Sequence, residues 1–254
     1  MRKTGYAAFS RQTSGKILEF IGTSGAGKTT LFNRSMTRLK NRWFFAYHMD
    51  LFKRKAPPSQ VDEILMQILQ KRIENINSSE SFCPWHSLLD LKLSVRVMHE
   101  TMVVAHSAYP KGFAFDEGLF RHFTAEILQL DDLCLVDLWK NRAFVYLRAR
   151  TPETALARVK SRTEKLTQLE RQRDRTDDQI LFRIVQEQEM FQSIIDKAAT
   201  FDCPVLVIDA EDPFEDSVNR VLDFESSLIQ RFKSQETRKT TSDNSIAQID
   251  EAKR

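Results

Sequence analysis

Residues 22–29 read Gly22-Thr23-Ser24-Gly25-Ala26-Gly27-Lys28-Thr29 and match the pattern G-x-x-x-x-G-K-S/T at every defined position. Glycine at the first and sixth positions lets the backbone turn with unusual dihedral angles and approach a phosphate closely. Successive N–H groups of such a loop point inward as an anion-binding nest, beside the positive end of the following helix. The lysine neutralises phosphates, and the hydroxyl after it can bind Mg²⁺. The stretch therefore predicts a loop that holds the phosphates of a nucleotide.

The segments on either side of this loop support the same interpretation. Residues 17–21 form a short apolar run that suits a buried strand, and residues 29–42 contain neither glycine nor proline and have a helical apolar spacing. A glycine-rich turn that binds nothing is the alternative, and the strand–loop–helix context disfavours it. We therefore assign nucleotide binding to the whole loop and the residue after it: Gly22, Thr23, Ser24, Gly25, Ala26, Gly27, Lys28, Thr29 and Thr30.

Strand-like and helix-like segments alternate along the rest of the chain. Further strands are expected at 43–49, 113–116, 143–147 and 205–208, and helices at 61–76, 88–107, 119–140, 180–199 and 213–232. This alternation predicts an α/β protein with the three-layer P-loop NTPase fold, in which helices cover both faces of a mainly parallel five-stranded sheet. We expect a single domain at 16–232, a flexible arm at 1–15 and a disordered tail at 233–254.

The composition narrows the classes of protein that are plausible. The chain has 254 residues, of which 41% are hydrophobic, and a formal net charge of +3. This suits one α/β core, and the small excess of positive charge does not predict nucleic-acid binding. The cysteines are few and widely spaced, and no apolar run is long enough to span a membrane, so we expect a cytoplasmic protein with reduced thiols. A homodimer remains an open alternative.

The second motif is an apolar run that ends in an acid. Residues 113–115 read Phe-Ala-Phe and are followed by Asp116, Glu117 and Gly118. An acid at the carboxyl end of a strand beside a phosphate loop can hold Mg²⁺ through water. The alternative is an ordinary acid that caps the next helix. We predict a metal site made by Thr29 and Asp116.

The third motif combines an apolar strand, a helix start and spaced arginines. In residues 145–162 the strand runs into Thr151-Pro152-Glu153, which is typical of a helix start, and Arg158 and Arg162 follow one turn apart. This stretch resembles the thymidylate kinase and deoxynucleoside kinase families. The resemblance implies a helical lid at about 158–178, whose arginines clamp the transferring phosphoryl group. A solvated charged helix is the other interpretation of these residues.

The resemblance covers roughly residues 17–230, with departures on the acceptor side. Residues 203–217 are similar to the last strand and loop of these kinases, which implies that residues 209–213 pack against adenine. Thymidylate kinases carry Asp-Arg-Tyr-like residues after the third strand, and deoxynucleoside kinases carry Glu-Arg-Ser. This chain lacks the adjacent arginine, and Arg121 is the candidate replacement. Its Asp-Glu-Gly form is similar to thymidylate-kinase-like ATP-binding proteins of bacteria.

The acceptor side is predicted by position alone. Asp50 follows the second strand, where the resemblance implies a carboxylate that accepts the proton of an attacking hydroxyl; a helix cap or surface acid is the alternative. Arg96, Glu117 and Arg121 are the candidate substrate residues. The candidate catalytic residues are Lys28, Asp50, Asp116, Arg158 and Arg162.

Two functions remain open at this point. The first is a small-molecule kinase that uses ATP and Mg²⁺ and transfers the γ-phosphoryl group to a nucleoside, a nucleotide or another small metabolite. The second is a nucleotide-dependent switch or regulatory ATP-binding module that acts on a protein partner. A guanine-specific GTPase is disfavoured because no Asn-Lys-x-Asp follows a strand.

Overall fold

The computed structural model describes residues 16–39, 42–45, 60–78, 84–105, 111–161 and 176–231. The predicted arm at 1–15 and tail at 233–254 lie outside these residues. So do Asp50, Arg162 and most of the predicted lid.

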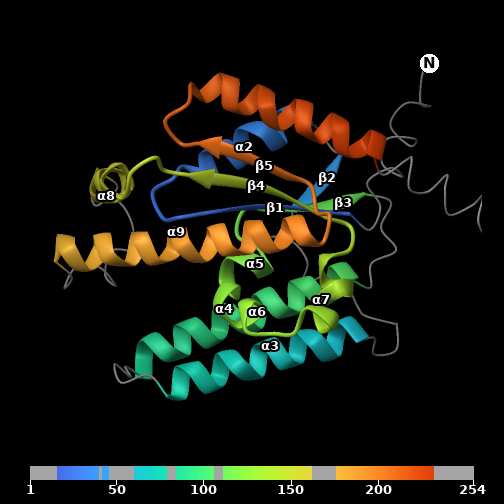
Figure 1. Ribbon diagram of the computed structural model, residues 1–254, viewed down its shortest axis with the longest axis vertical. Helices are drawn as coiled ribbons and strands as arrows, with labels where there is room; N and C mark the ends of the chain where they lie inside the picture. Colours follow the sequence, from blue (N-terminus) through green and yellow to red (C-terminus); the bar gives the residue numbers. More distant parts are fainter. Residues whose placement is uncertain are drawn as a thin grey trace, which may run out of the picture.

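One five-stranded sheet forms the centre of the molecule (Figure 1). Its strands are β1 (Ile17–Gly22), β2 (Trp43–Phe45), β3 (Gly112–Phe115), β4 (Arg142–Arg148) and β5 (Val205–Asp209). They lie in the order β2-β3-β1-β4-β5, and each neighbouring pair is parallel. All the carboxyl ends therefore open onto one edge of the sheet, with β1 in the middle.

Helices cover both faces of this sheet, which confirms the predicted α/β architecture (Figure 1). On one face lie α2 (Lys28–Leu39) and a helix at 214–231. On the other lie α3 (Gln60–Asn77), α4 (Pro84–Ala105), α5 (Leu119–His122), α6 (Thr124–Leu128), α7 (Asp132–Trp139) and α9 (Asp177–Thr200). The remaining helix, α8 (Pro152–Ser161), lies beyond the carboxyl end of β4. None of the described helices is long and apolar enough to cross a bilayer.

Two element boundaries differ from the prediction. The helix expected from residue 88 begins at Pro84, because proline is well accommodated at the first position of a helix, where no N–H donor is needed. Residues 119–140, expected to be mostly helical, form three short helices. The last of these starts anew at Asp131, whose carboxylate accepts the Leu133 N–H at 2.8 Å.

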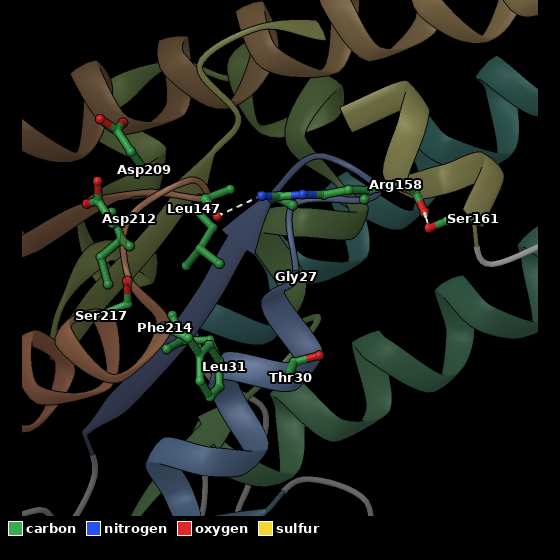
Figure 2. A pocket seen from close by; sticks show the side chains of 14 residues that line it. Gly27, Thr30, Leu31, Leu147, Arg158, Ser161, Asp209, Asp212, Phe214 and Ser217 are labelled. Atoms are coloured by element: carbon green, nitrogen blue, oxygen red, sulfur yellow. Dashed lines mark hydrogen bonds between the residues drawn. The ribbon is translucent and has the colours of Figure 1, made fainter. Parts of the chain in front are cut away.

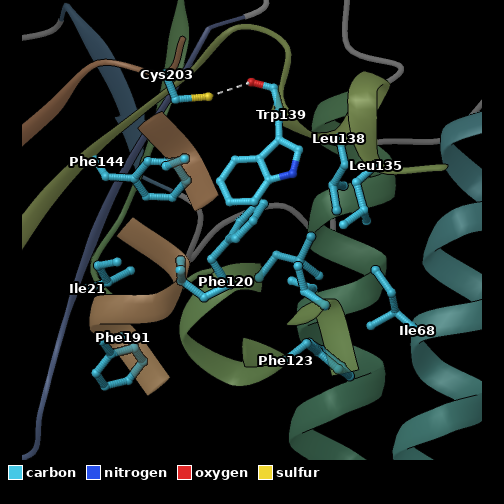
Figure 3. Packing of buried hydrophobic residues seen from close by; sticks show 14 of the residues in the cluster. Ile21, Ile68, Phe120, Phe123, Leu135, Leu138, Trp139, Phe144, Phe191 and Cys203 are labelled. Atoms are coloured by element: carbon cyan, nitrogen blue, oxygen red, sulfur yellow. Dashed lines mark hydrogen bonds between the residues drawn. The ribbon is translucent and has the colours of Figure 1, made fainter. Parts of the chain in front are cut away.

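Aromatic packing fixes α5 beneath the sheet (Figure 3). The Phe120 ring lies 4.3 Å from that of Trp139 and 5.1 Å from that of Phe144 in β4, measured between centroids. Phe120 and Phe144 are fully buried. Since α5 follows directly after residues 116–118, this packing also fixes the acidic end of β3.

One buried carboxylate joins the helix at 214–231 to the start of β2, an outer strand of the sheet. Glu225 is fully buried and accepts hydrogen bonds from Arg42 at 2.8 Å and from the indole N–H of Trp43 at 3.1 Å. Val218, Val221 and other apolar residues of the same helix belong to the core cluster that contains α2. Trp43 is therefore a core residue.

Candidate nucleotide-binding site

The loop between β1 and α2 has the backbone that its glycines predict. Gly22, Gly25 and Gly27 have φ angles of 147°, 84° and 93°, which favour glycine. A Cβ on Gly22 would lie 2.1 Å from the Leu147 carbonyl oxygen, so the loop base packs directly on β4. A Cβ on Gly27 would meet nothing within 4 Å, which leaves open space above this part of the loop.

Lys28 lies buried beneath the loop. Its Nζ donates to the Thr23 carbonyl oxygen at 2.9 Å and lies 4.0 Å from the Glu117 carboxylate. Burial and, to a smaller extent, the nearby Arg121 lower the pKa of Lys28 to about 8, although three nearby carboxylates oppose both effects. A bound anion would favour the charged form of this lysine.

Thr29 and Asp116 meet at the carboxyl edge of the sheet, as the sequence predicts. The Thr29 hydroxyl lies beside the Asp116 carboxylate, and Asp116 is only 5% exposed. Burial raises the pKa of this carboxyl group. Its Oδ1 atom is buried and has no hydrogen-bond partner among the described residues. A free carboxylate oxygen beside a hydroxyl fits a hydrated Mg²⁺ ion that is shared with phosphates.

The remaining described residues form no cage of their own for a metal. In this part of the chain no group of three or more His, Cys, Asp or Glu side chains could hold an ion.

A cavity of about 270 Å³ adjoins the loop on the side of β5 (Figure 2). Its walls come from residues 25–27, the start of α2, the end of α8 and the loop after β5. Arg158 lines it and donates to the Ala210 carbonyl oxygen at 3.0 Å. Asp209 is held by Arg148 at 2.7 Å and by Arg150 at 3.4 Å. The loop predicted to pack against a base thus forms one wall of a real cavity, and Arg158 lies on this side of the site.

Two of the candidate acceptor residues, Glu117 and Arg121, lie near Lys28. Arg121 is 18% exposed, stacks at 5.0 Å over the Phe191 ring and has a buried Nε without a partner among the described residues. Glu117 lies between Lys28 and His122, 3.9 Å from the histidine. Arg96 is more peripheral: it is over half exposed and pairs with Glu100 at 3.6 Å.

His122 takes part in this group, although its sequence context gave no reason to select it. Burial lowers the pKa of His122 to about 4; Glu117 opposes the shift, while Arg121, Arg72 and Arg96 add to it. The imidazole is therefore neutral at physiological pH.

Two further residues support the site and were missed by sequence reasoning. Glu19 of β1 is fully buried; it pairs with Arg142 at 3.2 Å and accepts the Phe120 N–H at 2.7 Å. A Cβ on Gly118 would lie 2.6 Å from the Glu19 carboxyl carbon, so a larger residue there would displace the Glu19 carboxylate. A lone acid in an apolar strand was a usable signal for Glu19. Glu187 of α9, whose carboxylate touches the phosphate loop, carried no such signal in a densely charged helix.

Comparisons with known proteins find distant structural similarity and no sequence match. No protein-family model and no curated protein sequence matches the chain. Similar solved structures include deoxyadenosine kinase from M. mycoides with the products dCMP and a flexible dCDP bound, at 15% identity and a TM-score of 0.43, with 84% of this chain and 99% of that chain covered. The same kinase with bound dATP has 12% identity and a TM-score of 0.43, with 82% and 97% covered. The parallel order β2-β3-β1-β4-β5 and the glycine loop after the central strand confirm the three-layer P-loop NTPase fold that the sequence predicts.

Proposed function

We propose that this chain is a kinase that uses ATP and Mg²⁺ and transfers the γ-phosphoryl group to a nucleoside, a nucleotide or another small metabolite. One observation carries the proposal: an intact phosphate loop lies next to a hydroxyl–carboxylate pair, Thr29 and Asp116, whose buried Oδ1 lacks a partner among the described residues. Phosphoryl transfer depends mainly on positioning and on charge stabilisation, and these groups are suited to both.

On the donor side, the loop amides and Lys28 would bind the phosphates. Thr29 and Asp116 would hold Mg²⁺, which neutralises phosphate charge when bound. The base would occupy the cavity between the loop and residues 209–213, with Arg158 at its wall. The clamp role of Arg162 remains a prediction outside the described residues.

On the acceptor side, Arg121 would take the place of the arginine that is missing beside Asp116. It lies close enough to Lys28 to act on its pKa, so both cations face the same region. Glu117 and Arg96 would contact the acceptor. Asp50, outside the described residues, stays the predicted base for an acceptor that reacts through a hydroxyl group.

The contact between Glu187 and Ser24 favours a second candidate, a nucleotide-dependent regulatory module acting on a protein partner. A ligand bound to the loop would act directly on this contact with α9. A shift of α9 would then change the surface offered to a protein partner. This candidate predicts slow hydrolysis without an acceptor.

Calorimetry and a turnover assay test both functions. We expect the wild-type protein to bind Mg-ATP and to consume ATP with at least one acceptor from a panel of nucleosides, nucleotides and other small metabolites. Lys28→Ala is the matched control and should lose productive binding. Tight ATP binding without turnover on any acceptor would favour the regulatory module. A folded protein that ignores both Mg-ATP and Mg-GTP would refute both candidates.

A further inference from the structure

Glu187 brings a carboxylate against the phosphate loop from the middle of α9. Its Oε2 atom accepts the Ser24 N–H at 3.3 Å and lies 3.7 Å from the Arg121 guanidinium, and its Oε1 atom accepts from Arg183 at 3.1 Å. The Glu187 side chain is only 7% exposed. An internal anion therefore already uses one of the loop's amides.

This carboxylate accepts hydrogen bonds from the same kinds of donor as a phosphoryl group does. Both are anionic acceptors that take backbone N–H and guanidinium donors. Burial alone would raise the pKa of Glu187, but Arg121, Arg183 and the Ser24 amide lower it below its ordinary value. The group is therefore ionised in the free protein, and it would repel a triphosphate that approached the same donors.

In the free protein, an anion at this place reduces the repulsion between two neighbouring cations. Arg121 and Lys28 are close enough to repel each other, while Glu187 attracts both. Without a ligand, the carboxylate offsets this concentration of positive charge. With a triphosphate bound, the ligand would supply that negative charge instead.

We propose that Glu187 is an internal counter-anion of the phosphate loop, which a phosphoryl oxygen replaces when a nucleoside triphosphate binds. The inference rests on the proposed nucleotide binding. The exchange frees Arg121 for the bound phosphates, whereas Arg183, one turn from Glu187 on α9, keeps its partner. Glu187 is thus a positioning residue that holds Arg121 beside Lys28 until the ligand binds. It also lowers the apparent affinity for the nucleotide, because the nucleotide binds only to molecules in which the Ser24 amide is not occupied by Glu187.

Glu187→Gln tests the exchange, because the amide keeps the shape and an acceptor oxygen but removes the charge. We expect this variant to bind Mg-ATP about tenfold more tightly in calorimetry, the effect of losing one charge-assisted competitor. Glu189→Gln is the matched control: it removes the same charge from an exposed position on the same helix, and its affinity should equal that of the wild type. A residue needed only for structure would not yield tighter binding when it is changed.

The outcomes separate this inference from the proposed function. Wild-type binding with equal or weaker binding by a folded Glu187→Gln protein overturns the exchange but leaves the function intact. If neither protein binds Mg-ATP, both fail. Should the variant not fold, a crystal structure of the wild type with Mg²⁺ and a non-hydrolysable ATP analogue decides. A phosphoryl oxygen at the Ser24 N–H supports the exchange, and Glu187 still bonded there refutes it.

Discussion

Asp116 illustrates, at the scale of single residues, a conflict between stability and the predicted chemistry. The metal role needs an ionised carboxylate, yet burial raises the pKa of this group, so its charge is unfavourable in the folded state. Residues kept for function, such as a buried charged group, are often not those that would make the folded protein most stable.

We therefore expect opposite effects of Asp116→Asn on stability and on activity. Because the amide carries no charge to desolvate, the melting temperature at pH 7 should be equal to or above that of the wild type. Mg²⁺-dependent turnover should fall by about 100-fold or more, the usual effect of removing one electrostatic group from an active site. Differential scanning fluorimetry and steady-state kinetics check the two halves, and a large drop in melting temperature with unchanged turnover would contradict both.

His122 predicts a pH dependence of stability. Its pKa is lowered from 6.5 to about 4 in the folded protein, so the unfolded chain binds the proton more readily. The associated stability is present above pH 6.5 and is lost as the pH falls towards 4. Between pH 6.5 and 4.5 this group alone should remove about 2 kcal/mol from the free energy of unfolding.

Urea unfolding of the wild type and of His122→Gln over this pH range measures the contribution. The variant should lose about 2 kcal/mol less than the wild type on acidification. Parallel losses in the two proteins would show that His122 does not titrate as its surroundings imply.

At the scale of elements, Glu19 links β1 to the start of α5. Its carboxylate joins Arg142 of β4 to the Phe120 N–H, so residues 116–121 are anchored to the two central strands. Removing one partner from a buried ion pair leaves the other charge uncompensated.

Glu19→Ala should accordingly lower the free energy of unfolding by about 3–5 kcal/mol. The control is Glu215→Ala, which removes an exposed acid paired with Arg34 and Arg38 and should cost less than about 1 kcal/mol. Chemical denaturation compares the two. A similar small loss in both variants would show that the buried pair does not anchor the acidic loop.

At the scale of the whole molecule, nucleotide binding should be visible as stabilisation. Mg-ATP at 100 times its dissociation constant would add about 2.7 kcal/mol to the folded state. For a domain of this size the melting temperature should then rise by about 5–10 °C. Thermal scans with and without Mg-ATP test this, with Lys28→Ala as the variant expected to show no rise. A wild-type melting temperature that does not depend on the ligand would count against the site.

Features set by neighbouring residues could be predicted from the sequence, whereas features set by contacts between distant segments could not. The loop at 22–29 and the meeting of Thr29 with Asp116 were predictable, because parallel strands bring their carboxyl ends to one edge. The order of the strands was not, since it depends on pairing between distant segments. The helical character of residues 119–140 was predictable, but their division into three helices was not, and the last of these starts at a local cap made by Asp131. Glu187 could not be found, because nothing in a helix's own sequence says that a loop 163 positions away will meet it.

The hydrogen bonds that Glu225 accepts from Arg42 and Trp43 have a consequence for synthesis on the ribosome. The residues that cover α2 and satisfy Trp43 come from the helix at 214–231, which leaves the exit tunnel long after the strands that it protects. Until then, the part of that sheet face that α2 does not cover stays exposed and can associate with other chains. We therefore expect a fragment that stops before residue 214 to depend on chaperones, whereas the longer chain can close its own core.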